Sequence, residues 1–185
     1  MTDASEGETP SHPIPHTMKK LFAAAFAALA IATPAQASTA DVRQLMDLIK
    51  QTGTTISFNT NRQDSHCINN AGYYYLDHDS NQKVKTDLLV ICRDQVDLNN
   101  ADKVWEALSH EATHIMQACT GDTAFTEEDH PTMFRELNRK APHYSKLVDN
   151  YHGRDARYEA EAFWMELQPE EDVIGYFKDI CFKKD

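Results

Sequence analysis

Two histidines four residues apart, His110 and His114, enclose Glu111 in the segment His-Glu-Ala-Thr-His. Side chains four apart on an α-helix lie on one face, so both imidazoles can reach one ion. Glu111 is rotated by about 100° from His110, and its carboxylate can instead reach a water molecule on that ion. Zinc acidifies such a water, and a carboxylate accepts the proton. The pattern predicts a hydrolytic zinc site with Glu111 as the base.

The motif lies inside the strongest helical pattern of the chain. Asn99 or Asn100 is a suitable N-cap, and Gly121 marks the end of the helix. With nine histidines in the chain, chance would produce the motif in about a few per cent of such sequences. The alternative interpretation is two surface histidines beside a solvated glutamate. It is less favoured because a half-buried helix face would then carry three titratable groups without a role.

A catalytic zinc also needs a third protein ligand and an open position. In the extended motif with a third histidine, glycine would replace Gln117 and histidine would replace Thr120, so metzincins are excluded. A carboxylate from a later helix is the remaining common solution. Glu159 shares a helical stripe with apolar residues and is the first choice, and Glu161 on a neighbouring face is the second.

The N-terminal part has the three regions of a secretory signal. A basic start at Met18 is followed by an apolar run over 21–31 and by small residues around Ala37. We therefore predict a signal peptide over 18–37, a spurious or disordered extension over 1–17, and one mature domain over 38–185 that is periplasmic or secreted. The apolar run is shorter than the roughly 20 residues of a membrane anchor. A buried helix behind a disordered tail is the alternative.

All four cysteines lie in the predicted mature domain, and an even number in an exported chain is typical of two disulfides. Three pairings are possible. Cys67 with Cys92 and Cys119 with Cys181 is favoured, because each pair then joins neighbouring elements. A four-cysteine zinc site is disfavoured because no two of them follow the CxxC spacing.

The remaining patterns predict an α+β fold, in which a small antiparallel sheet precedes a helical half. A helix over 41–50 and a strand over 54–58 come first, and strands over 72–77 and 87–92 form a hairpin. Helices are then expected for the motif segment and over 132–140, 143–151, 154–167 and 169–181. The net charge of −11 repels phosphate, so a peptide or protein is expected as partner rather than nucleic acid.

The segment Tyr158-Glu159-Ala160-Glu161-Ala162-Phe163, ending near Pro169, follows the motif helix. Over roughly residues 104–169 the chain resembles small gluzincin metallopeptidases, including compact bacterial enzymes that cleave repressors. The resemblance implies a minimal zincin-like fold, a Zn²⁺ cofactor and cleavage of a peptide that pairs with the edge of the sheet, here the 72–92 hairpin. The export signal and the cysteines depart from the cytosolic relatives, so the substrate stays open.

Gluzincins also supply a Tyr, His or Arg that stabilises the developing oxyanion. The resemblance implies Tyr151, His152, Arg154 or Arg157 for this role, with Tyr151 and His152 as the catalytic candidates. No spacing rule selects one of them. A hypothesis of another class is a binding or inhibitor module in which zinc and disulfides are only structural, and it predicts closed coordination by four protein ligands.

Overall fold

The computed structural model describes residues 37–183. The predicted extension over 1–17 and the predicted signal peptide, apart from Ala37, lie outside the described residues. Within 37–183, the helices are all too short or too polar to traverse a bilayer.

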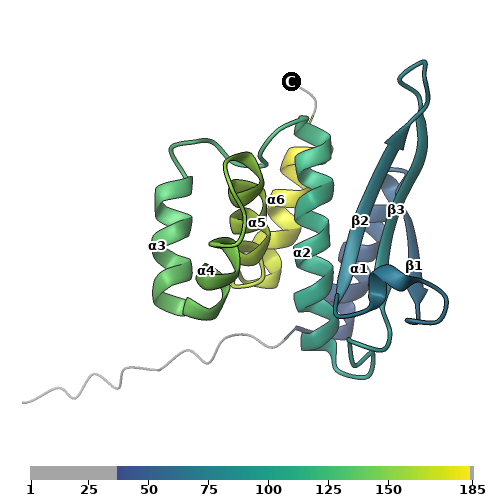
Figure 1. Ribbon diagram of the computed structural model, residues 1–185, viewed down its shortest axis with the longest axis horizontal. Helices are drawn as coiled ribbons and strands as arrows, with labels where there is room; N and C mark the ends of the chain where they lie inside the picture. The colour runs from purple at the N-terminus through teal and green to yellow at the C-terminus, as the bar shows by residue number, and fades with distance from the viewer. Residues whose placement is uncertain (1–36, 184–185) are drawn as a thin grey trace, which may run out of the picture. The chain divides into compact units, whose positions relative to one another are not determined.

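The described residues form an α+β fold, as predicted, in which α2 stands between a sheet and the later helices (Figure 1). The elements before the motif helix are α1 (Thr39–Gln51), β1 (Thr55–Asn59), a 3-10 turn η1 (Ser65–Cys67), β2 (Gly72–His78) and β3 (Val84–Cys92). The motif helix and the elements after it are α2 (Ala101–Thr120), α3 (His130–Lys140), α4 (Pro142–Val148), α5 (Arg154–Met165) and α6 (Glu170–Cys181).

The sheet has the order β1-β3-β2 and is mixed. Strands β2 and β3 form the antiparallel hairpin that the sequence predicts, but β3 starts at Val84 because that residue pairs with His78. Strand β1 runs parallel to β3, with Thr55 opposite Leu88. The sheet is therefore mixed, and not antiparallel throughout as predicted. Strand β2 lies at an edge of the sheet, next to α2.

Helix α2 has a cap at each end. The Asn100 side chain accepts hydrogen bonds from the backbone N–H of Asp102 and Lys103, and Gly121 closes the helix at a φ of 76°. Asn100, one of the two predicted caps, therefore starts the helix. The buried side chains of α2 include residues on several faces, because the sheet, α1, α5 and α6 all pack against it. Packing on these sides holds the motif in a fixed position.

Helix boundaries differ from the sequence prediction at two places that matter for the site. The helix predicted over 143–151 starts one residue earlier, at Pro142, where the missing N–H of proline costs nothing. Helix α4 ends at Val148 rather than Tyr151, so Tyr151 lies in the connection to α5. Helix α5 ends at Met165, and Glu166 follows as its C-cap.

Both favoured disulfide pairings are confirmed. Cys67 is bonded to Cys92, and Cys119 is bonded to Cys181 across a sequence separation of 62 residues. The second bridge links the end of α2 to the end of α6. It adds a covalent constraint to the packing of the motif helix, since closing so long a loop restricts the unfolded chain strongly.

Candidate metal centre

Two imidazoles and one carboxylate converge between α2 and α5. The Nε2 atoms of His110 and His114 lie 3.5 Å and 3.9 Å from the Glu159 carboxylate oxygens. One ligand atom from each of the three side chains lies within 4.8 Å of the others. Ligand atoms about 2.0–2.1 Å from a tetrahedral ion are roughly 3.4 Å apart, so the spacing and the donor types fit zinc.

The ring of His110 is oriented by a residue outside this group. Its Nδ1 lies 2.7 Å from Glu166 Oε1, and the Tyr144 hydroxyl donates to the other oxygen of Glu166 at 2.5 Å. A carboxylate only accepts, so Nδ1 carries a proton and Nε2 is turned towards Glu159. Burial lowers the pKa of His110, but Glu159 and Glu166 outweigh it and raise the pKa to about 10. A metal ion must therefore displace a proton from Nε2.

Gln117 holds the ring of His114. Its amide nitrogen donates to Glu161 Oε2 at 2.9 Å and to the Tyr158 carbonyl at 3.0 Å, and both groups only accept. The Gln117 oxygen must then face His114 Nδ1, 2.8 Å away, which requires Nδ1 to donate. The free lone pair of His114 is consequently on Nε2, towards Glu159. Burial, together with the neighbouring His110, lowers the pKa of His114 and favours the neutral form that binds metals.

Glu111 lies beside the three side chains, where sequence reasoning put the base. Only 5% of its surface is exposed. Burial raises the pKa of Glu111 to about 7. The charges of Glu159 and Glu166 also raise this pKa, whereas the charge of His110 lowers it. A carboxyl group with a pKa near neutrality can both take up and return a proton at that pH.

Gly72 brings β2 close to Glu111. A Cβ at this position would lie 2.8 Å from the Val90 carbonyl oxygen and 3.2 Å from Glu111 Oε1. Both contacts are too short, and the carbonyl belongs to the backbone of the central strand. Glycine therefore permits the edge strand to pass directly over the carboxylate.

We predict that Gly72→Ala lowers the free energy of unfolding by about 1–3 kcal/mol, because the extra methyl group overpacks this contact. Urea unfolding of the metal-free protein measures the loss. Gly175→Ala is the matched control, since a Cβ there meets nothing within 4 Å and alanine favours a helix over glycine by roughly 0.5–1 kcal/mol. Equal stabilities of the two variants would contradict the role assigned to Gly72.

Glu161, the second choice as metal ligand, is directed away from the imidazole Nε2 atoms. It is completely buried and accepts hydrogen bonds from four donors. The donors are Gln117 Nε2, the backbone N–H groups of Ala124 and Phe125, and His130 Nε2. Glu161 thus ties the loop after α2 to α5 and orients Gln117, and Glu159 is the carboxylate that faces the histidines.

The four candidates for oxyanion stabilisation differ in whether they line a cavity beside the three side chains. Tyr151 lines both cavities beside the three side chains, and the charge of Glu159, with partial burial, raises its pKa. His152 is exposed and lines neither cavity. Arg154 contacts Asp122, and Arg157 contacts Glu127. Of the four residues, the structure brings Tyr151 to the site.

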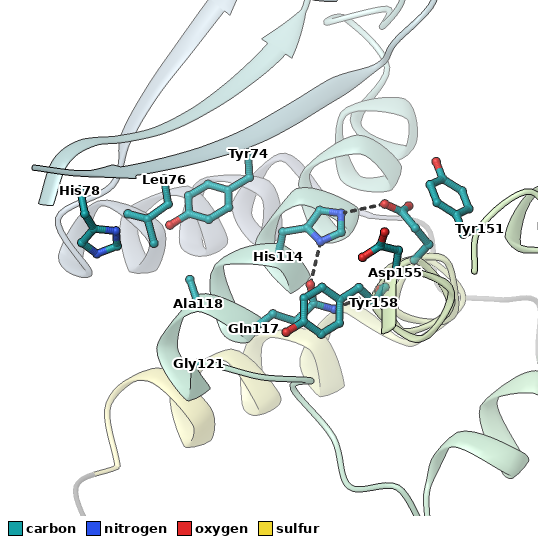
Figure 2. Close-up of a pocket in the computed structure, with 11 residues that line it drawn as sticks. Tyr74, Leu76, His78, His114, Gln117, Ala118, Gly121, Tyr151, Asp155 and Tyr158 are labelled. Carbon is teal, nitrogen blue, oxygen red and sulfur yellow. Dashed lines mark hydrogen bonds and ion pairs between the residues drawn. The ribbon is translucent and has the colours of Figure 1, made fainter. Parts of the chain in front are cut away.

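Two cavities adjoin the three side chains and share Tyr74, His114, Tyr151 and Glu159. The Tyr158 cavity, of about 700 Å³, lies towards the ends of β2 and α2 and is drawn in Figure 2. Its lining consists of Tyr74, Leu76, His78, His114, Gln117, Ala118, Gly121, Tyr151, Asp155, Tyr158 and Glu159. The Tyr144 cavity, of about 740 Å³, lies on the other side and includes Gly72, His110, Glu111, Tyr144 and Glu166. Together they provide room for a ligand on both sides of the centre.

Comparison with known proteins identifies a family. A family model described as a domain of unknown function, DUF8637, matches residues 38–182. The chain belongs to this family. No significant match was found among curated proteins or among solved structures.

Sequence reasoning missed Glu166 as a functional residue and considered Gln117 only as a departure from another motif. Both follow the metal-site residues at helical spacings, Glu166 seven positions after Glu159 and Gln117 three positions after His114. Those spacings put each residue on the same face as its neighbour. They were a usable signal, but only the packing of α5 on α2 selects these two residues from the other polar side chains.

Proposed function

We propose that this chain is an exported zinc metallopeptidase in which His110, His114 and Glu159 hold the ion and Glu111 is the general base. The observation that carries the proposal is the convergence of these ligand atoms within 4.8 Å at a cavity wall. Three protein ligands beside open space are typical of catalytic zinc, whereas structural zinc has four.

Zinc at this position would acidify a water molecule and polarise a substrate carbonyl. Glu111 would accept a proton from the attacking water on its carboxylate as the new C–O bond forms, and would return that proton to the amine as the peptide C–N bond breaks. Glu166 and Gln117 keep the two Nε2 atoms directed at the ion. The Tyr151 hydroxyl, whose raised pKa keeps it protonated, donates a hydrogen bond to the oxyanion that develops on the carbonyl.

The edge strand β2 supports a peptide as the substrate. The Cys92 N–H donates to the Ala71 carbonyl at 2.9 Å, so the alternation of an antiparallel pair turns the peptide groups of Gly72, Tyr74 and Leu76 away from β3. The side chains of Tyr74 and Leu76 line the Tyr158 cavity. The Tyr74 backbone N–H already donates a hydrogen bond to the Glu111 carboxylate, so an extended peptide along β2 would pair with the remaining outward backbone groups while crossing the metal centre.

Two disulfides support the proposed export, because such bonds persist in oxidising compartments. The N-terminal signal pattern points to the same compartment.

Metal analysis and a hydrolysis assay test the proposal together. We expect the oxidised chain, purified without its signal, to bind one zinc ion and to cleave an unfolded protein such as labelled casein. A chelator should stop cleavage, and added zinc should restore it. Zinc bound in stoichiometric amount without any hydrolysis of unfolded proteins would instead favour the non-catalytic zinc module.

A further inference from the structure

The Tyr158 cavity combines aromatic walls with a carboxylate. Tyr74 and Leu76 of β2 face Tyr151, Asp155 and Tyr158 on the helical side (Figure 2). The cavity begins at His114 and Glu159, so a side chain in it would belong to a residue next to the reacting bond. Its volume, about 700 Å³, is sufficient for a long side chain.

Asp155 lies in the first turn of α5, where its charge favours the helix N-terminus, and it is not neutralised by a basic side chain. Among residues 37–183, no ion pair and no side-chain hydrogen bond of Asp155 is present. The preceding Arg154 does not neutralise it, because that guanidinium lies 3.3 Å from Asp122 and donates to the Gly121 carbonyl at 3.2 Å. Asp155 is thus an available anion at the wall of the cavity.

A second carboxylate adds to the negative potential. Burial raises the pKa of Tyr74, and the charge of the nearby Asp87 on β3 raises it further. The Oδ1 atom of Asp87 is buried without a hydrogen-bond partner. A cation in the cavity would therefore be attracted by Asp155, which lines the wall, and by Asp87, which does not line the cavity but lies near Tyr74.

The tyrosine rings suit a cation as well. The faces of aromatic rings attract ammonium and guanidinium groups. The Arg154 guanidinium lies over one face of the Tyr158 ring, 4.9 Å from its centre, so that face is already occupied by a group of this chain. Tyr74 and Tyr151 offer further rings in the same cavity.

We propose that the Tyr158 cavity binds a lysine or arginine side chain of the substrate, adjacent to the scissile bond, through Asp155 and the tyrosine rings. This inference rests on the proposed peptidase function and names its substrate class. An acidic side chain would be repelled by Asp155, and an aliphatic one would bury that carboxylate without compensation. A cationic side chain has a methylene stem that fits the apolar walls and a charged end that pairs with the carboxylate.

Peptide binding to a variant that cannot turn over tests this subsite without relying on activity. We would measure fluorescence anisotropy of labelled peptides with Glu111→Gln protein, both zinc-loaded and metal-free. Each peptide carries lysine, glutamine or glutamate at one test position and uncharged residues at all other positions. The test position is moved along the sequence from one set of peptides to the next. At one position we expect lysine to bind about tenfold more tightly than glutamine, the combined effect of an exposed ion pair and cation–π contacts.

Adding Asp155→Asn should reduce that advantage to roughly twofold, the part left to the rings. Adding Asp172→Asn, which removes an exposed carboxylate of α6, should leave the tenfold advantage intact. Equal binding of lysine and glutamine peptides, absence of binding by all peptides, or an advantage that persists in Asp155→Asn, would overturn the inference.

Cleavage of the same peptides by the unmodified chain separates the two proposals. Cleavage without a preference for a basic residue would overturn the cationic subsite and leave the peptidase function in place. A binding preference that depends on Asp155, with no cleavage of any peptide, would overturn the peptidase function and leave a site for cationic side chains.

Discussion

Replacing Glu111 with glutamine is expected to reduce hydrolysis of an unfolded protein by roughly 10²–10⁴-fold, the usual contribution of a positioned general base. An amide has the shape of the carboxylate but cannot take up a proton at neutral pH. Zinc should still bind, because His110, His114 and Glu159 are unchanged. The prediction is checked by measuring turnover and bound zinc on the same preparation.

The fold should tolerate Glu111→Gln. The raised pKa of Glu111, about 7, shows that burial disfavours its charged form, so a neutral side chain of equal size removes an unfavourable charge. Glu171→Gln, at an exposed position of α6, is the matched control and should retain full activity. Hydrolysis by the Glu111→Gln protein at the unmodified rate would rule out Glu111 as the base.

The motif helix and the convergence of its two histidines were predictable because they depend on local spacing. His110 and His114 are brought together by the helix itself, and Asn100 and Gly121 end that helix by their own side-chain and backbone properties. The preference for Glu159 came from the apolar stripe that it shares on α5, and the structure does turn Glu159 towards the imidazoles.

Features that depend on contacts between distant segments were not predictable. The local sequence of β1 is the same whether the strand pairs with β3 in parallel, as observed, or adds to the hairpin as an antiparallel strand. Gly72 looks like any glycine at the start of a strand until Val90 and Glu111 are placed around it. Glu161 looks like a solvated glutamate, yet the loop after α2 folds over it and supplies donors from Ala124 and Phe125.

Separate substitutions of Glu159 and Glu161 are expected to have different effects. The first should mainly lower zinc affinity, and the second should mainly lower the free energy of unfolding. Glu159→Gln replaces an anionic ligand with a poor one, and we expect zinc affinity to fall by at least about 100-fold, more than the loss typical of outer residues. Glu159 lies at the cavity wall with 20% of its side chain exposed. Water can replace its lost contacts, so the metal-free protein should lose about 1 kcal/mol or less.

Glu161→Gln should have the opposite profile. Oε1 accepts from Phe125 N–H and His130 Nε2, and Oε2 accepts from Gln117 Nε2 and Ala124 N–H. In either orientation, the NH₂ group of a glutamine amide would face two hydrogen-bond donors, which would then lose their acceptor. Breaking such a buried network costs about 3–5 kcal/mol in unfolding free energy. Zinc affinity should fall by no more than roughly 10–100-fold, through the looser hold of Gln117 on His114.

Urea unfolding of the metal-free proteins and competition with a zinc-binding dye measure both quantities for both variants. The comparison decides the third ligand because each variant removes one negative charge from the same helix, so a general electrostatic effect would act on both alike. A Glu161→Gln protein of normal stability that no longer binds zinc would make Glu161 the ligand. Unchanged zinc affinity in Glu159→Gln would remove the carboxylate on which the proposed centre depends, since within residues 37–183 it is the acidic side chain that joins both His110 and His114.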